Sequence, residues 1–256
     1  MNDEEETPGQ RLKSVDQAFQ IIEYLRENGP VTLSEITDDL ELPMSTAHVH
    51  LSTLVANEYV IKSEREYRCS LRFLRVGGEM RDKLSLFQTA KDEVDDLSDT
   101  LGEYANVGTI ENGYMVQLYK SRNSSSIDDN APLGSHLYLH STGLGKAMLS
   151  RLSQERLDMI LDLRGLPKLT PTTITDRQAL EKELAEIRDR GYAVNRSEHF
   201  TGVCAVAVPI LSERNEVIGA ISASGPISRM GDTRIEEEIA PALFDKQNFI
   251  ELKIKQ

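Results

Sequence analysis

The sequence of 256 residues has no tryptophan and only two cysteines, Cys69 and Cys204. Two cysteines in a chain of this length cannot form the disulfide framework of a small secreted protein, so a reducing compartment is expected. No apolar run approaches the ~18 residues that a membrane-spanning helix needs. The acidic start, MNDEEETPGQ, is unlike a signal or transit peptide. These absences predict a cytoplasmic protein that has no membrane partner.

Positive charge is also scarce, with 29 Lys and Arg against 42 Asp and Glu and a net charge of −13. Taken alone, this balance argues against nucleic acid, because phosphates attract basic surfaces. Only 11 of the cations are lysine. An acid-rich, lysine-poor composition favours a salt-rich cytoplasm, as in a halophilic archaeon, and an ordinary acidic cytosolic protein is the alternative.

Residues 11–57 have the apolar periodicity of three helices. The first is stopped by Asn28-Gly29-Pro30, and a capping box at Thr32 and Glu35 starts the second. The third is expected from about Ser45 to Asn57 and presents small polar groups outward. This arrangement predicts a helix-turn-helix, although any small three-helix bundle has the same spacing. The residues predicted to face the DNA major groove are Ser45, Thr46, His48, Val49 and Ser52.

The segment after the third helix predicts the hairpin of a winged helix. Residues 59–62 and 66–70 have strand character on either side of a short turn. Residues 62–75 carry five cations against two acids, which makes them the one basic stretch of an acidic domain. We expect Arg65 and Arg68 to contact phosphate or the minor groove. A solvated strand face is the alternative reading of the same charges.

Beyond residue 80, helical and strand patterns alternate. Residues 81–103 have helical spacing and predict a linker helix that leads into a second domain. Asn112-Gly113 is a strong hairpin signal, and a terminal helix is expected from Asp232, interrupted at Pro241. Further strands are expected at residues 192–194, 203–210 and 217–224. The pattern predicts an α+β domain with a mostly antiparallel sheet.

Two features of the second domain suit a small ligand. The turn at Gly143 and Gly145 lets backbone approach closely, and the helix that follows would point free N–H groups at an anion such as a carboxylate. Ser222 and Ser224 alternate on one strand, so both hydroxyls face the same side. They can bind a small polar ligand or simply lie on a solvated sheet face.

The cysteine and histidine residues of the second domain give weaker indications of a catalytic or metal site. Cys204 and His199 could be read as a nucleophile and its base, but no third orienting group is evident, and a cysteine in an apolar strand usually acts as a small hydrophobe. His136 and His140 could share a strand face, but no cysteine or acid stands beside them to complete a metal site. No catalytic residue, metal or cofactor is therefore predicted.

Seven segments, in order and at family spacing, resemble the IclR family of transcription regulators over roughly residues 11–230. The segments are KSVDQAFQIIEYL, LPMSTAHVHLSTL, YRCSLRFLRVG, LHSTGLGKAML, LTPTTITD, RGYAVNRSEHFTGVCAVAVPI and AISASGPISR. The resemblance implies an N-terminal winged helix-turn-helix, a linker helix and a C-terminal effector-binding domain similar to GAF and PAS folds. It also implies a homodimer or dimer of dimers that binds double-stranded operator DNA. Many members bind small organic acids and control nearby catabolic genes.

The resemblance also implies where an effector would bind and where this chain departs from the family. The implied effector-binding residues are Gly143, Leu144, Asn195, Ala205, Ser222 and Ser224. Asn195 stands where keto-acid-binding members have an aspartate, and Ala205 where they have a cysteine. These differences argue against glyoxylate or pyruvate and favour a somewhat larger sugar acid or keto acid.

The third helix, which would be the recognition helix in the DNA groove, also departs from the family pattern. Met44 and Val49 stand where lysine and arginine are common, which shifts phosphate contact to the wing and to Arg11 and Lys13.

The chain is predicted to divide into four parts: a disordered tail at 1–10, a winged helix-turn-helix at 11–78, a linker helix at 79–100 and an effector-binding and oligomerisation domain at 101–256. The rival functions are a ligand-independent DNA binder and a small-molecule enzyme that uses Cys204.

Overall fold

The computed structural model describes residues 11–122 and 131–255, so the predicted tail at 1–10 lies outside the described residues. The chain forms two compact units, residues 1–80 and residues 81–256. Among the described residues, no helix is both long enough and apolar enough to cross a bilayer.

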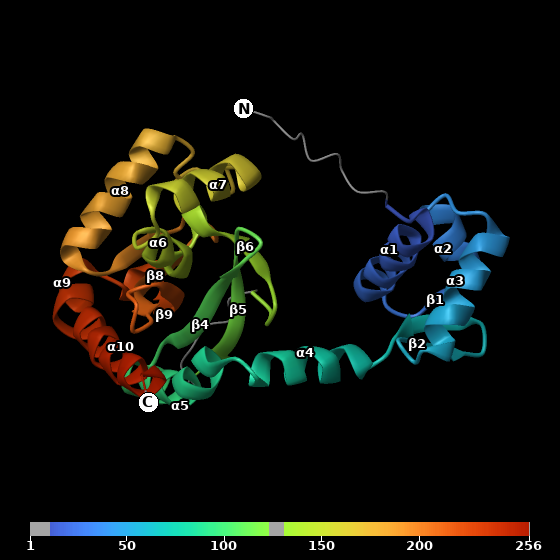
Figure 1. Ribbon diagram of the computed structural model, residues 1–256, viewed down its shortest axis with the longest axis horizontal. Helices are drawn as coiled ribbons and strands as arrows, with labels where there is room; N and C mark the ends of the chain where they lie inside the picture. The colour runs from blue at the N-terminus through green and yellow to red at the C-terminus, as the bar shows by residue number, and fades with distance from the viewer. Residues whose placement is uncertain (1–10, 123–130, 256) are drawn as a thin grey trace. The chain divides into compact units, whose positions relative to one another are not determined.

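The first unit is a winged helix (Figure 1). Its elements are α1 (Lys13–Asn28), β1 (Val31–Thr32), α2 (Leu33–Asp39), α3 (Met44–Ala56), β2 (Val60–Ser63) and β3 (Glu66–Cys69). The three helices enclose a core that includes Ile21, Ile36 and Leu51, each fully buried. The predicted capping box is present, because the Thr32 side chain accepts from the Glu35 amide while the Glu35 carboxylate accepts from the Thr32 amide. Local sequence signals therefore specify this unit well.

The predicted hairpin follows α3. Strands β2 and β3 pair antiparallel with Ser63 opposite Glu66, which leaves a two-residue turn at the tip. Strand β1 pairs with the outer side of β3, so the sheet order is β1-β3-β2. Tyr67 points from β3 into the helical core. This packing fixes the wing against the helices, and it confirms the winged helix-turn-helix.

The helical segment after the wing, predicted as a linker helix running into the first helix of the second domain, is divided into two helices. It consists of α4 (Arg72–Asp82) and α5 (Ser85–Leu101), separated at residues 83–84. No residue of α4 is buried, whereas α5 buries seven, including Phe87, Val94 and Leu101. The buried face of α5 packs on the sheet of the second unit. The sequence has no proline or glycine at the break to signal it.

The second unit is built on a six-stranded sheet. Its strands are β4 (Tyr104–Glu111), β5 (Tyr114–Ser121), β6 (His136–Tyr138), β7 (Ala193–Arg196), β8 (Val203–Leu211) and β9 (Val217–Pro226). Their order is β6-β5-β4-β9-β8-β7 with every neighbouring pair antiparallel. Its remaining helices are α6 (Gly143–Leu149), α7 (Gln154–Arg164), α8 (Arg177–Arg190), α9 (Asp232–Arg234) and α10 (Ala240–Ile254). The predicted α+β class with an antiparallel sheet is confirmed.

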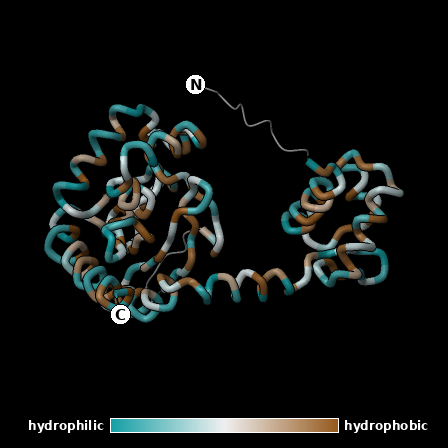
Figure 2. The backbone as a smooth tube through the Cα atoms, viewed as in Figure 1, coloured by the Kyte–Doolittle hydropathy of each residue, from teal (hydrophilic) through white to brown (hydrophobic). Residues whose placement is uncertain are grey.

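Helices cover both faces of this sheet. Figure 1 shows α5 and α10 along one face and α6, α7 and α8 on the other. Along β9, Ile221 and Ala223 enter the core beneath α5 and α10, while Ser222 and Ser224 point to the opposite side. Figure 2 shows hydrophobic colour in the central strands and alternating colour along the outer helices, as expected of helices with one buried face.

The start of α6 sits close to the sheet. The Thr142 side chain caps the helix by accepting from the Gly145 amide at 3.0 Å. A side chain at Gly145 would collide with the backbone of Leu139, in the 3-10 turn Leu139–Ser141. A side chain at Gly143 would press on Ala205 of β8 at 3.3 Å. Glycine at these two positions therefore brings the first turn of α6 against the strands.

Candidate DNA-binding surface and ligand cavity

The outward face of α3 is exposed and has few internal contacts. Ser45, His48 and Ser52 are exposed, Thr46 is half-buried, and Val49 is 63% exposed. The inward positions, Ala47 and Leu51, are fully buried. The structure therefore brings the five predicted groove-facing residues onto one side of one helix. They present hydroxyl and imidazole groups and one apolar side chain, the types that read base edges and thymine methyl groups.

The cations of the wing divide into two groups. Arg72 pairs with Glu58, and Arg75 pairs with Glu79 at 3.0 Å. Arg65 and Arg68 are exposed and form no ion pair with any described residue. Arg68 donates one hydrogen bond, to the Cys69 carbonyl at 3.4 Å. The two arginines that the sequence singled out are thus free of ion pairs to described residues. Of the two predicted N-terminal contacts, Lys13 is exposed, and Arg11 pairs with Asp16 at 2.7 Å.

A cavity of about 60 Å³ lies between α6 and the sheet of the second unit. One water molecule fills roughly 10–15 Å³ on this measure, so the space is on the scale of a small organic molecule. All six predicted effector-binding residues line it, from α6 and from strands β7, β8 and β9. The amides of Gly143 and Leu144 belong to the first turn of α6, where a helix has no internal acceptor for its N–H groups.

A chain of neutral polar groups forms the sheet side of the cavity. Gln117 of β5 donates to the Asn106 side-chain oxygen at 2.8 Å. The Asn106 amide then donates to Ser224 at 3.0 Å and to Ser222 at 3.3 Å. All four side chains are buried, and no lysine or arginine lines the cavity among the described residues. The cavity can therefore hold a polar ligand through neutral hydrogen bonds.

Asn195 lines the cavity but is already held by the protein. Its amide nitrogen donates to the Ser141 carbonyl, and its oxygen accepts from the Glu198 amide at 3.1 Å. Nearby, Ser141 Oγ contacts His199 Nδ1 at 2.9 Å. Burial lowers the pKa of His199, and His140 lowers it further. His199 is thus a neutral polar group on the cavity wall.

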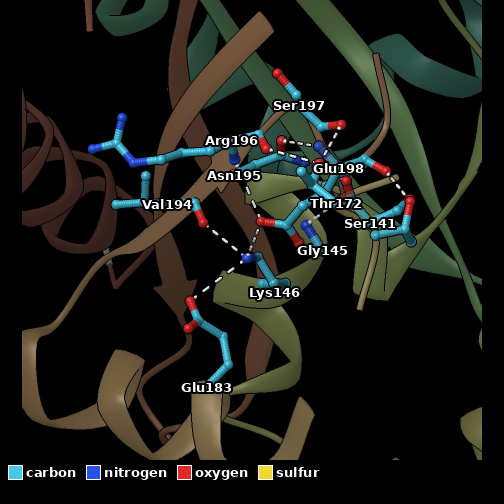
Figure 3. A network of polar contacts seen from close by, with 12 residues as sticks. Ser141, Gly145, Lys146, Thr172, Glu183, Val194, Asn195, Arg196, Ser197 and Glu198 are labelled. Atoms are coloured by element: carbon cyan, nitrogen blue, oxygen red, sulfur yellow. Dashed lines mark hydrogen bonds and ion pairs between the residues drawn. The ribbon is translucent and has the colours of Figure 1, made fainter. Parts of the chain in front are cut away.

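A buried charged network lies behind this wall (Figure 3). Lys146 of α6 is 1% exposed and donates to the Val194 carbonyl at 2.8 Å and to Glu198 at 2.7 Å. It also lies 3.5 Å from Glu183 of α8, which in turn pairs with Arg190. Burial raises the pKa of Glu198 against the lowering effect of Lys146. Sequence reasoning missed this network, because a single lysine in a short helix gives no signal that its side chain is buried.

The structure does not bring together the alternative reactive residues. Cys204 is fully buried on the core side of β8, and burial raises the pKa of its thiol to about 11. A thiol with this pKa is not an activated nucleophile. His140 contacts the Pro167 carbonyl and His136 the Gly134 carbonyl. Among the described residues, no group of three or more possible ligands could hold a metal ion.

Asn106 and Gln117 are the cavity residues that the sequence analysis missed, together with Thr142 and the wall residues Met115 and Phe200. The available signal was a polar side chain within an otherwise apolar strand, at Asn106 and again at Gln117. The role of these two polar side chains follows only from the strand order. Strand β4 lies between β5 and β9 and sets Asn106 directly opposite Ser222.

A winged helix joined in one chain to a domain with a small, largely apolar cavity that has a polar floor is the arrangement of a ligand-responsive DNA-binding regulator. Comparison with known proteins agrees with this class. Residues 14–63 match the IclR helix-turn-helix domain, and residues 78–248 match the profile described as "Bacterial transcriptional regulator IclR C-terminal". The chain belongs to the IclR family of transcription regulators.

Several relatives span nearly the whole chain. The repressor AllR of Salmonella paratyphi A is 32% identical over 90% of this chain and 86% of its own. The probable regulator ArcR of Halobacterium salinarum is 27% identical over 96% of this chain and 95% of its own. The crystal structure of Thermotoga maritima IclR matches with a TM-score of 0.83 at 27% identity and covers 96% of this chain and 100% of its own. These proteins are transcription regulators rather than enzymes.

Proposed function

We propose that this regulator controls catabolic genes in response to a small organic acid, such as a sugar acid or keto acid. The observation that carries the proposal is the cavity, where the six predicted positions line one small space that has polar groups on its sheet side and is otherwise largely apolar. The effector's carboxylate would lie on the amides of Gly143 and Leu144, and Ser222 and Ser224 would hold its other oxygens. The crystal structure of a double mutant of the inducer-binding domain of Acinetobacter PobR, 26% identical with a TM-score of 0.60, contains 3-hydroxybenzoic acid. That ligand is also a carboxylic acid, which supports this class.

For the DNA-binding unit, we propose that α3 enters the major groove of an operator. Thr46, His48, Val49 and Ser52 would meet base edges, with Ser45 at the helix start, and Arg65 and Arg68 of the wing would contact phosphate or the minor groove. Arg11 and Lys13 would add backbone contacts. Because the net charge is −13, phosphate contact would depend on these few cations, of which Arg11 would exchange its pair with Asp16 for a phosphate.

The proposed assembly is a homodimer or a dimer of dimers, because a single winged helix rarely supplies enough contacts for specific binding. Exposed apolar side chains support self-association. Leu12, Val15 and Phe19 follow one side of α1 and are 46–66% exposed, and Leu71 and Leu74 are more than 70% exposed. Patches of this kind commonly mark protein interfaces. Sedimentation of the full chain is expected to show a dimer or tetramer, and a monomer would contradict this assembly.

A thermal-shift screen of the full chain with organic acids tests the effector. At least one acid is expected to raise the melting temperature, because binding to the folded state alone stabilises it. Replacing Ser222→Ala together with Ser224→Ala should remove that increase, whereas Ser228→Ala, at an exposed position outside the cavity, should leave it unchanged. A screen without any stabilising acid would favour the ligand-independent DNA binder.

A further inference from the structure

Helix α3 carries no side chain of the kinds that usually identify guanine, adenine or cytosine in the major groove. Guanine is read by arginine or lysine, adenine by asparagine or glutamine, and cytosine by aspartate or glutamate. The sequence of α3, MSTAHVHLSTLVA, contains none of these residue types. Its polar side chains are hydroxyls and imidazoles, which can both donate and accept and so fit more than one base.

The exposed apolar side chains of α3 are its distinctive contact groups. Met44 is the first residue of the helix and is 57% exposed, and Val49 is 63% exposed. Val49 lies on the outward side with Ser45 and Ser52, whereas Leu51 faces the core of the first unit. In a helix-turn-helix, the residues near the start of the recognition helix are the ones that contact base edges. Both apolar side chains are therefore placed to meet bases rather than phosphates.

Thymine is the base that such a surface recognises, because its C5 methyl is the one methyl group that DNA displays in the major groove. We infer that Val49 and Met44 select thymine by packing on C5 methyl groups, so that each half-site of the operator has thymine at the positions that these side chains reach. The inference rests on the proposed function, because it requires α3 to lie in the major groove. It adds which base is read and which side chains read it.

Methyl recognition and phosphate contact contribute to affinity in different ways. Packing on a methyl group removes apolar surface from water and releases no counterion, whereas Arg65 and Arg68 of the wing would neutralise phosphate. Loss of one methyl group should therefore weaken binding by roughly 4-fold, the scale of one buried carbon. It should leave the salt dependence of binding unchanged, which separates this contact from a general loss of electrostatic affinity.

Deoxyuridine tests the inference, because it lacks only the C5 methyl of thymidine and keeps the same hydrogen-bonding groups. A random-sequence pool of duplexes is first enriched for binding to the full chain, and each thymine of one enriched half-site is then replaced by deoxyuridine. Fluorescence anisotropy is expected to show a loss of roughly 4-fold at one or more positions, with an unchanged slope of log affinity against log salt. Enriched half-sites without thymine, or deoxyuridine duplexes that bind as tightly as the originals, would overturn the inference.

Two variants assign the methyl contacts to their side chains. In Val49→Ala the shortened side chain no longer reaches the methyl group, so thymine and deoxyuridine should give equal affinity at one position. Met44→Ala should do the same at a second position. Leu163→Ala is the matched control and should keep every difference, because Leu163 of α7 is 61% exposed but lies in the second unit. If both α3 variants also keep the full difference at every position, the inference is wrong.

The proposed function and this inference fail differently. Ser52→Asp places a negative charge on the outward side of α3 and should abolish DNA binding if this helix lies in the groove. If Ser52→Asp binds DNA as tightly as the wild type, or if the pool is enriched for no sequence, the proposed DNA contact fails and this inference fails with it. If Ser52→Asp does not bind and deoxyuridine has no effect, only the inferred base contact is wrong.

Discussion

The DNA-binding surface and the ligand cavity use polar residues in opposite ways. On α3 and the wing, the candidate contact residues are exposed and largely without partners, as at Val49 and Arg65. In the cavity, Asn106, Gln117 and Ser222 are at most 4% exposed and are joined by hydrogen bonds. The first surface is free to take its contacts from DNA. The second has its donors and acceptors oriented before any ligand arrives, so its selectivity depends on internal bonds.

Loss of Lys146 is expected to give the largest change in stability, because it leaves Glu198 as a buried, unpaired charge. Lys146→Met should destabilise the second unit by about 3–5 kcal/mol. Urea unfolding followed by far-UV circular dichroism measures this change, since the chain has no tryptophan for fluorescence. The double variant Lys146→Met with Glu198→Leu should recover most of the loss. If it is no more stable than the single variant, the buried charge is not the cause.

At the wing, charge removal should affect binding and leave stability unchanged. Arg65→Ala with Arg68→Ala is expected to weaken binding to all DNA sequences and to reduce the slope of log affinity against log salt by about 2 for each protomer bound to the DNA. Fluorescence anisotropy with DNA from upstream of the protein's own gene measures both. Arg75→Ala is the matched control, because Arg75 is already paired with Glu79. An unchanged slope in the double variant would remove the wing from the DNA-binding surface.

Substitution of Cys204 tests the alternative hypothesis that the protein is an enzyme that uses this thiol. Cys204→Ala should cost about 1 kcal/mol of stability, as for loss of a small buried group. Binding of DNA and of any stabilising acid should not change. In the folded protein, a thiol reagent should react first at the half-buried Cys69. Loss of acid binding on selective modification of Cys204 would revive the enzyme reading.

The smallest expected effect is the pH dependence at His199. Its pKa is lowered in the folded protein, so the unfolded chain binds protons more readily just below the ordinary histidine pKa of about 6.5. Stability is therefore full above about pH 6.5 and falls as the pH decreases towards the folded pKa. Between pH 7 and about pH 5.5, His199→Phe should lose less melting temperature than the wild type, by a few degrees at most. Equal losses would mean that His199 is not desolvated.

The elements with strong local sequence signals were predicted correctly. The capping box at Thr32, the Asn112-Gly113 hairpin and the periodicity of α3 each depend on neighbours within a few residues, and each is present. The six cavity positions came from ordered family motifs. The position of the helix break at residues 83–84 was not predicted, because neither proline nor glycine stands there.

The hydrogen bonds inside the cavity and the buried ion pairs behind it could not be predicted from the sequence. Asn106 meets Ser222 across 116 residues of chain, and only the pairing of β4 with β9 brings them together. Lys146 is buried by contacts to residues about 40–50 positions later, on α8, β7 and the loop that follows it. No local pattern encodes such contacts. The net charge of −13, which alone argued against DNA, concealed two arginines at the wing that form no ion pair with described residues.

The most direct test of the account measures DNA affinity of the full chain with and without an acid that stabilises it. The acid is expected to change the affinity for upstream DNA at fixed salt, and Ser222→Ala with Ser224→Ala should abolish that change while DNA binding itself is retained. A stabilising acid that leaves DNA affinity unchanged would contradict the claim that the cavity controls the winged helix.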